Sequence, residues 1–281
     1  MAAIDEPMLV AERMIPRLLL AFALAAAALP AFAFDQGYAA WDALLKKHVR
    51  VLEGGNASRL DYAGMARDGT KLGAVLDDFQ NVTRAEFDGW TKPQREAFLM
   101  NAYNAFTIRK ILTRYPAIQS IRDFGTFFGN PWKDKFFTLF GEPASLDMIE
   151  QEMLRKEGVY DEPRVHVAVV CASVGCPMLR NEAFVAERLD MQLEDAMRRF
   201  LSDRSRNRYD PGTRRLEVSK IFDWYGKDFE HGWHGYASVK ATLARYADLL
   251  ADRAEDRAAI RAGRVDVAFL DYDWSLNDAK P

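Results

Sequence analysis

Both cysteines of the chain, Cys171 and Cys176, lie in the stretch 164–177, which also holds His166, one of four histidines. A cysteine near a histidine is the combination that nucleophilic thiol catalysis requires, because an imidazole can accept the thiol proton. Two neighbouring cysteines can instead form a disulfide, or both can be buried as small, inert side chains. The stretch therefore marks where a site would lie and leaves its chemistry open.

Metal binding is a further alternative for this stretch, and the sequence supports it less than the others. The C-x4-C spacing of Cys171 and Cys176 is not matched by a second Cys or His pair at zinc spacing. His231 and His234 lie close together in sequence, but the glycines beside them are typical of a loop. We expect no metal and no cofactor.

Residues 165–170 are β-branched and apolar apart from His166, a pattern that predicts a short strand buried on both faces. Residues 172–177 are small and turn-forming, so Cys171 would stand where the strand ends and a loop begins. Side chains alternate across a strand, which puts His166 and Cys171 on opposite faces. A direct pair between them would need a bulge or a rotated strand end.

A long helix is predicted from residue 92 to about residue 115, with Thr91 as its cap and Pro93 in its first turn. Asn101 and Asn104 fall on its apolar stripe. A buried amide without partners costs about 1–3 kcal/mol, so both should hydrogen-bond. They either hold neighbouring backbone, for instance the 171–177 loop, or orient a catalytic histidine or an oxyanion.

Charged residues near the central stretch are further candidates for binding. Ser145 is expected to cap a helix that carries Glu150, and the simplest partner of Glu150 is Arg164 or another basic group near the strand. An aromatic helix over residues 220–229 contains Tyr225 and Asp228. Together with Cys176, these residues form the candidate binding set.

The remaining pattern is helix-rich with short strands. Helical spacing covers residues 38–51, 72–79, 182–202, 239–250 and 255–262. Extended segments are expected at residues 59–62, 135–140 and 214–218, and residues 267–277 form a strand with a polar, aromatic tail. The predicted class is α+β, a helix-rich single domain around a small, mostly antiparallel sheet.

The N-terminus reads as a targeting segment. An apolar run over residues 18–29 precedes Pro30-Ala-Phe-Ala33, which is a signal-peptide cleavage pattern. A start at Met14 would give this segment the usual positive end. We expect a signal peptide at 1–33, a single globular domain at 34–281 and export, with the periplasm as the expected compartment. The formal net charge of −3 gives no basic excess for nucleic acid, and no later segment is apolar enough to span a membrane.

Several segments in this order resemble the domain-of-unknown-function family numbered 547. The most specific is Pro163-Arg-Val-His-Val-Ala-Val-Val-Cys-Ala-Ser-Val-Gly-Cys-Pro177. The other segments lie at residues 98–108, 116–121, 146–150, 222–229 and 272–277, so the resemblance covers nearly all of the chain after residue 33. Met100 and Val167 depart mildly from the family pattern. The resemblance implies a shared fold and candidate residues, and no reaction, because the family has no established activity.

Two hypotheses about function follow. In the favoured one, the chain is a binding or scaffold module in which a Cys171–Cys176 disulfide shapes a loop for an unknown protein or small molecule. Asn101, Asn104, Arg164 and His166 would form a buried network, and Trp132, Trp233 and Tyr236 would supply contact area.

In the alternative, the chain is a cysteine-dependent hydrolase or acyltransferase. Cys171 would be its nucleophile, with a histidine base and an asparagine that orients the base or holds the oxyanion. The candidates for these two roles are His166, His231 and His234, and Asn101 and Asn104.

Overall fold

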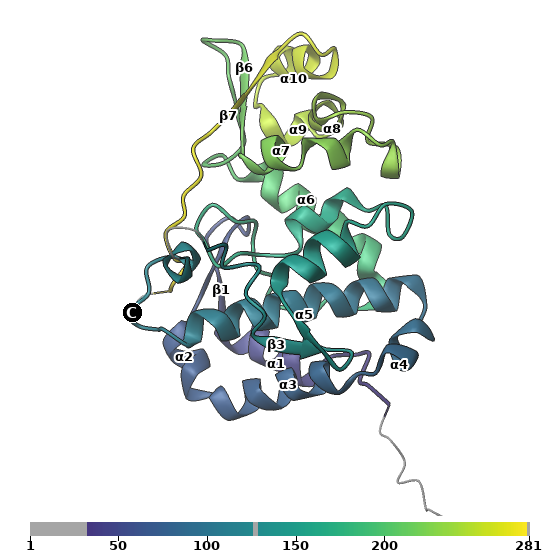
Figure 1. Cartoon of the computed structure of the whole chain (residues 1–281). Coiled ribbons are helices and arrows are strands. Elements are labelled where there is room, and N and C mark those ends of the chain that lie inside the picture. Colours follow the sequence, from purple (N-terminus) through teal and green to yellow (C-terminus); the bar gives the residue numbers. More distant parts are fainter. Residues whose placement is uncertain (1–32, 126–128, 280–281) are drawn as a thin grey trace, which may run out of the picture. The chain divides into compact units, whose positions relative to one another are not determined.

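The computed structural model describes residues 33–125 and 129–279. Apart from Ala33, the predicted signal peptide lies outside these residues. Residues Phe34–Pro281 form one compact unit. Its architecture is helix-rich α+β, as predicted, with the strands in small separate sheets (Figure 1).

The N-terminal helices pack around one long central helix, α5 (Lys92–Leu112). It begins as predicted: the Thr91 side chain and Gln94 form a capping box, and Pro93 lies in the first turn. Most of α5 is buried in a first hydrophobic cluster, which extends from Tyr38 to Leu193. The helices before it are α1 (Ala39–His48), α2 (Tyr62–Arg67), α3 (Gly69–Asn81) and α4 (Arg84–Asp88).

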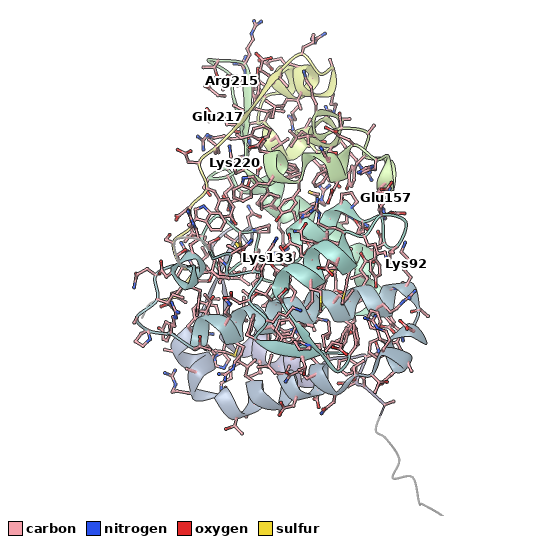
Figure 2. All side chains as sticks on the ribbon, in the orientation of Figure 1. Lys92, Lys133, Glu157, Arg215, Glu217 and Lys220 are labelled. Atoms are coloured by element: carbon pink, nitrogen blue, oxygen red, sulfur yellow. A yellow bond between two sulfur atoms is a disulfide. The ribbon has the colours of Figure 1, made fainter. Side chains whose placement is uncertain are left out.

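A second hydrophobic cluster forms in the C-terminal part and also includes Val167. Helix α6 (Leu189–Ser202) joins the two clusters, because Leu189 and Leu193 belong to the first and Met197 and Phe200 to the second. The helices around the second cluster are α7 (Ile221–Trp224), α8 (Val239–Arg245), α9 (Ala247–Leu250) and α10 (Ala254–Arg261). Charged side chains such as Lys92, Glu157 and Arg215 lie at the periphery (Figure 2).

The strands form three small sheets. Strands β1 (Val49–Val51) and β2 (Ser58–Leu60) form an antiparallel pair, as do β3 (Phe137–Leu139) and β4 (Glu142–Ala144). In the third sheet, β6 (Arg215–Val218) pairs antiparallel with β5 (Arg208–Asp210) and parallel with β7 (Asp266–Phe269). The structure therefore has three small sheets in place of the one small sheet expected, and Leu60, Leu139 and Leu216 of these sheets are buried in the two clusters.

The prediction of a buried strand at residues 165–170 is wrong. Pro163–Val167 is a 3-10 helix, η3, and the chain then runs as an irregular segment to Cys171. Asn104 is a physical reason for the difference: its amide nitrogen donates to the Ala168 carbonyl, and its oxygen accepts from the Val170 N–H. These backbone groups are therefore unavailable to a strand ladder. The segment is nonetheless buried as expected, between the two clusters.

Several predicted boundaries also differ. The helix expected at 182–202 is preceded by a 3-10 turn, η4 (Ala186–Arg188), and begins only at Leu189. Both backbone groups of Phe184 are bonded to the amide of Asn101, so they cannot join a helix. The helix expected at 220–229 breaks at Tyr225 into α7 and η5 (Gly226–Phe229), and the one at 239–250 breaks at Tyr246.

Short helical turns complete the fold. Ser145 caps the next helix as expected, but η2 (Met148–Leu154) is a π-helix. The remaining 3-10 turns are η1 (Ile121–Phe124) and η6 (Trp233–Gly235). Within the described ranges, no helix has the length and apolar character needed to cross a membrane.

The chain after β7 returns along the domain as an extended tail, drawn in yellow in Figure 1. The backbone of this tail bonds to three distant segments: Leu276 N–H to Gln119, Asn277 N–H to Ala172, and Ala279 N–H to Leu60. Val174 and Gly175 in turn donate to Ser275 and Asp273. The tail thus connects residues 171–177, here called the cysteine loop, to the N-terminal part of the domain.

Candidate functional site

Cys171 and Cys176 lie at disulfide distance, with their Cα atoms 6.3 Å apart. The backbone between them reverses at Ala172, whose φ of 62° lies in the left-handed region. Gly175 passes so close to the tail that a Cβ there would stand 3.0 Å from the Asp273 carbonyl and from the Tyr272 ring. The loop therefore has its shape because the tail packs on it.

Polar groups surround both sulfur atoms. The Cys171 N–H donates to Sγ of Cys176 at 2.9 Å, and Oγ of Ser173 lies 3.0 Å from Sγ of Cys171. The Tyr272 hydroxyl lies 3.2 Å from each sulfur. Burial raises the pKa of Tyr272 to about 12, against the hydrogen bond from Ser173, so its hydroxyl keeps its proton and can donate at neutral pH.

His166 is held by an acid on the far side of its ring. Its Nε2 lies 2.7 Å from Oδ2 of Asp228, and the ring stacks on Tyr225 at 3.8 Å between centroids. Arg155 binds the same carboxylate with two nitrogens, at 2.6 and 2.8 Å. Burial acts to raise the pKa of Asp228, but the hydrogen bonds from Arg155 and His166 outweigh it and hold that pKa well below its usual range.

Glu150 accepts hydrogen bonds from two tyrosines, at 3.0 Å from the Tyr103 hydroxyl and 2.7 Å from that of Tyr225. Burial, followed by the charge of Glu150, raises the pKa of both hydroxyls, which keeps them protonated as donors. Glu150 itself is presented by the π-helix η2, an irregularity often found at functional sites. The expected ion pair of Glu150 with Arg164 is not formed.

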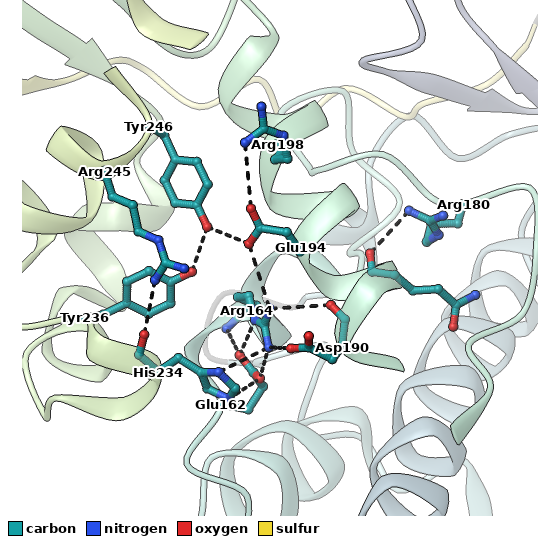
Figure 3. A network of polar contacts seen from close by, with 11 residues as sticks. Glu162, Arg164, Arg180, Asp190, Glu194, Arg198, His234, Tyr236, Arg245 and Tyr246 are labelled. Atoms are coloured by element: carbon teal, nitrogen blue, oxygen red, sulfur yellow. Dashed lines mark hydrogen bonds and ion pairs between the residues drawn. The ribbon is translucent and has the colours of Figure 1, made fainter. Parts of the chain in front are cut away.

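Arg164 belongs to a separate polar network (Figure 3). Its guanidinium binds Glu162 at 2.7 and 2.8 Å and Asp190 at 2.7 Å. His234 also binds Glu162, at 2.7 Å. Burial alone would raise the pKa of Glu162. The hydrogen bonds from Arg164 and His234 outweigh this effect, so the pKa of Glu162 is lowered to about 2.

A cavity of about 290 Å³ opens beside the two cysteines. It lies between the two hydrophobic clusters, since Tyr103 and Val169 line it from the first and Ile221 and Tyr225 from the second. Its polar walls include Asp147, Glu150 and His166. Its aromatic walls are formed by Tyr103, Trp132, Trp224, Tyr225, Tyr272 and Trp274.

The structure thus brings together Glu150, His166, Cys171, Cys176 and Tyr225 around one cavity, with Asp228 bonded to His166 behind it. The other candidates lie apart from it. Asn101 holds the backbone of Phe184, and both amide groups of Asn104 hold residues 168–170 just before Cys171. Among the described residues, neither His231 nor His234 lines this cavity, so the structure does not bring them to Cys171.

The aromatic residues were only partly foreseen. Trp132, expected as a contact residue, lines the cavity, whereas Tyr236 is buried in the second cluster. Tyr272, Trp224 and Arg155 were not among the candidates. The signal for Tyr272 was its place in a polar, aromatic tail, but nothing local in the sequence connects that tail to a loop about a hundred residues earlier.

Residues 87–201 match the model of a family described as "Protein of unknown function, DUF547". This match supports assignment of residues 87–201 to the DUF547 family. The matched DUF547 region contains the cysteine loop, His166, Glu150 and most of the first cluster. Tyr225, Asp228 and Tyr272 lie beyond it, so the cavity is completed by residues outside the matched region.

Comparison with curated proteins and with solved structures gave no significant match in either case. In the parts of the chain that the structure describes, no group of three or more His, Cys, Asp or Glu side chains is placed to hold a metal ion.

Proposed function

We propose that this chain is an exported binding module whose cavity beside Cys171 and Cys176 takes a small organic ligand. The observation that carries the proposal is the cavity itself, in which aromatic walls and a few fixed polar groups converge between two hydrophobic clusters. Small-molecule sites usually combine mainly apolar walls with few oriented polar groups. At about 290 Å³ the cavity suits a small molecule or one end of a larger one.

The polar groups of the cavity are held before any ligand arrives. Glu150 is fixed by two tyrosine hydroxyls, and His166 by Asp228 and the Tyr225 ring. Such preorganisation reduces the entropy lost on binding. In this proposal the cysteine pair is structural and shapes one wall, and the signal peptide at residues 1–33 directs the module to the periplasm.

The test is to fill the cavity. Val169→Trp places a large ring in its wall, and Met191→Trp adds the same ring at an exposed position on α6 as a matched control. Protein isolated from the periplasm is denatured, and the small molecules released are identified by mass spectrometry. We expect a compound that copurifies with wild type and Met191→Trp and is lost from folded Val169→Trp. Equal release from all three proteins, or no enriched compound in any, would argue against the proposal.

A second candidate is the thiol enzyme, and one observation favours it. In a strand, His166 and Cys171 would have pointed to opposite faces. The segment is instead a 3-10 helix followed by irregular chain, and both residues line the same cavity. Asp228 binds Nε2 of His166, as an orienting acid does in a nucleophile, base and acid arrangement. Nδ1 is then the ring nitrogen left to accept a thiol proton.

The two candidates differ in the state of the cysteines. Intact mass with and without reduction shows whether they are linked, and alkylation at several pH values measures the reactivity of Cys171. A linked pair that resists mild reductant supports the binding module. A free Cys171 that is alkylated rapidly near neutral pH, and more slowly in His166→Ala, supports the enzyme.

A further inference from the structure

We propose that the cavity beside Cys171 recognises an organic ammonium group, the amine or quaternary ammonium end of a small molecule. This inference rests on the proposed ligand-binding function and names the chemical class of the ligand. It is carried by two features that the cavity combines: a cluster of aromatic rings and an excess of carboxylates.

The aromatic cluster consists of Trp132, Trp224, Tyr272 and Trp274. Trp274 lies at its centre, with ring centroids 5.9 Å from Trp132, 5.5 Å from Trp224 and 4.6 Å from Tyr272. The rings come from three separate segments of the chain. Trp224 is 44% exposed, which is unusual for a tryptophan packed against other rings, and a ligand in the cavity would cover part of it.

The charge of the cavity is negative. Asp147 and Glu150 line it, and among its described lining residues there is neither a lysine nor an arginine. The guanidinium of Arg155 is close behind Tyr225, but its charge is matched by the two-point contact with Asp228. His166 also lines the cavity, but its ring is bonded to Asp228. A ligand with a positive charge would therefore meet two carboxylates with no lysine or arginine beside them in the lining.

Aromatic faces and carboxylates favour the same kind of ligand. The electron-rich face of a tryptophan attracts a cation, and recognition of quaternary ammonium groups is a known use of such rings. One cation of the chain already packs on a ring of this cluster, since the guanidinium of Arg122 lies 5.3 Å from the Trp274 ring. An anionic ligand would be repelled by both features. A neutral sugar would use the rings but would gain little from the carboxylate charge.

The test uses choline as the probe and 3,3-dimethylbutan-1-ol as its uncharged counterpart of the same shape. Binding to the full chain is measured by calorimetry and tryptophan fluorescence at constant ionic strength, with sodium chloride, glucose and acetate as further comparisons. We expect choline to bind about tenfold more tightly than the neutral alcohol.

Variants locate the site. Trp224→Ala removes one ring and Asp147→Asn one charge, and each should weaken choline binding by about threefold to tenfold. Trp233, expected as a contact residue, stacks on His231 and does not line the cavity, and neither does Asp252. Trp233→Ala and Asp252→Asn therefore make the same changes elsewhere and should leave choline binding within twofold.

Equal binding of choline and the neutral alcohol, tighter binding of glucose, or no binding of choline would each overturn the ammonium assignment. The proposed ligand-binding function is tested separately, because the loss of a copurified compound from Val169→Trp does not depend on whether choline binds.

Discussion

Nε2 of His166 lies 2.7 Å from Oδ2 of Asp228, although the two residues are 62 positions apart. The contact joins the buried segment before Cys171 to the 3-10 turn η5 in the second cluster. Since Arg155, the residue that follows η2, binds the same carboxylate, one aspartate connects three parts of the chain around the cavity. The placement of His166 thus depends on a single carboxylate.

Replacing Asp228 by alanine should destabilise the domain by about 2–4 kcal/mol, because it leaves Arg155 and His166 without their partner. Asp223→Ala, five residues earlier, removes only an exposed ion pair with Lys220 and should cost less than about 1 kcal/mol. Urea denaturation followed by circular dichroism measures both. Equal losses in the two variants would mean that the buried contacts contribute little.

Asn104 is expected to control the order of the segment before Cys171. Asn104→Ala and Asn101→Ala each remove two hydrogen bonds to buried backbone, and each should cost about 2–4 kcal/mol. Hydrogen exchange distinguishes them: exchange at residues 168–171 should accelerate in Asn104→Ala, whereas in Asn101→Ala the change should centre on Phe184. The same exchange pattern in both variants would contradict separate roles.

The Tyr272 hydroxyl should influence the reduced cysteines. It lies 3.2 Å from both sulfurs and stays protonated at neutral pH, so it can donate to a thiolate. In reduced protein, Tyr272→Phe should slow alkylation of Cys171 at pH 7 by about threefold to tenfold, since a neutral-to-charged hydrogen bond is lost. Tyr209→Phe, in β5, is the control and should react as wild type. Unchanged rates in Tyr272→Phe would show that the hydroxyl does not stabilise the thiolate.

Glu96 should make stability depend on pH. Burial, followed by the charge of Glu162, raises the pKa of Glu96 from 4.5 to about 8. The folded state therefore binds this proton more tightly than the unfolded state, and its contribution is full below pH 4.5 and is lost as the pH rises through 8.

The free energy of unfolding of wild type should be about 2–4 kcal/mol higher at pH 5 than at pH 9 because of Glu96. Glu96→Gln should abolish this contribution. Glu142→Gln, at an exposed position of β4, should retain this difference. Parallel pH profiles for wild type and Glu96→Gln would contradict the prediction.

Gly175 is expected to tolerate no side chain. An alanine Cβ would stand 3.0 Å from the backbone of Asp273 and from the Tyr272 ring, so the tail would have to move, at a cost of about 1–3 kcal/mol. Gly73→Ala, in α3, has open space around its Cβ and should be neutral or stabilising by up to about 1 kcal/mol. Thermal denaturation compares them, and a neutral Gly175→Ala would show that the tail packs loosely there.

Local signals in the sequence were sufficient for much of the helical framework. The cap at Thr91 and the proline at residue 93 located the start of α5 because both act within one turn of the helix. The central stretch was also correctly recognised as buried. Its conformation was not, because valine-rich sequence favours a strand only when its backbone groups are free to pair, and here the amide of Asn104 binds them.

The composition of the cavity depended on contacts that a single sequence does not encode locally. Glu150 was predicted to pair with Arg164 or another basic group near it in sequence, because their charges are opposite, but its carboxylate binds Tyr103 and Tyr225 instead. Arg164 has a nearer acid in Glu162. Where several acids and several donors are present, the pairing follows from packing and not from spacing.

The tail that fastens the cysteine loop also sets the order in which the site can appear during synthesis. Cys171 and Cys176 leave the ribosome about a hundred residues before Tyr272 and Trp274, so for that time the two thiols lack the Tyr272 hydroxyl and the Trp274 ring. If the chain is exported unfolded, the cysteines reach an oxidising compartment in this uncovered state. Oxidation of the pair and closure of the tail are then competing events, and the order in which they occur decides whether a newly made molecule carries a linked or an open pair.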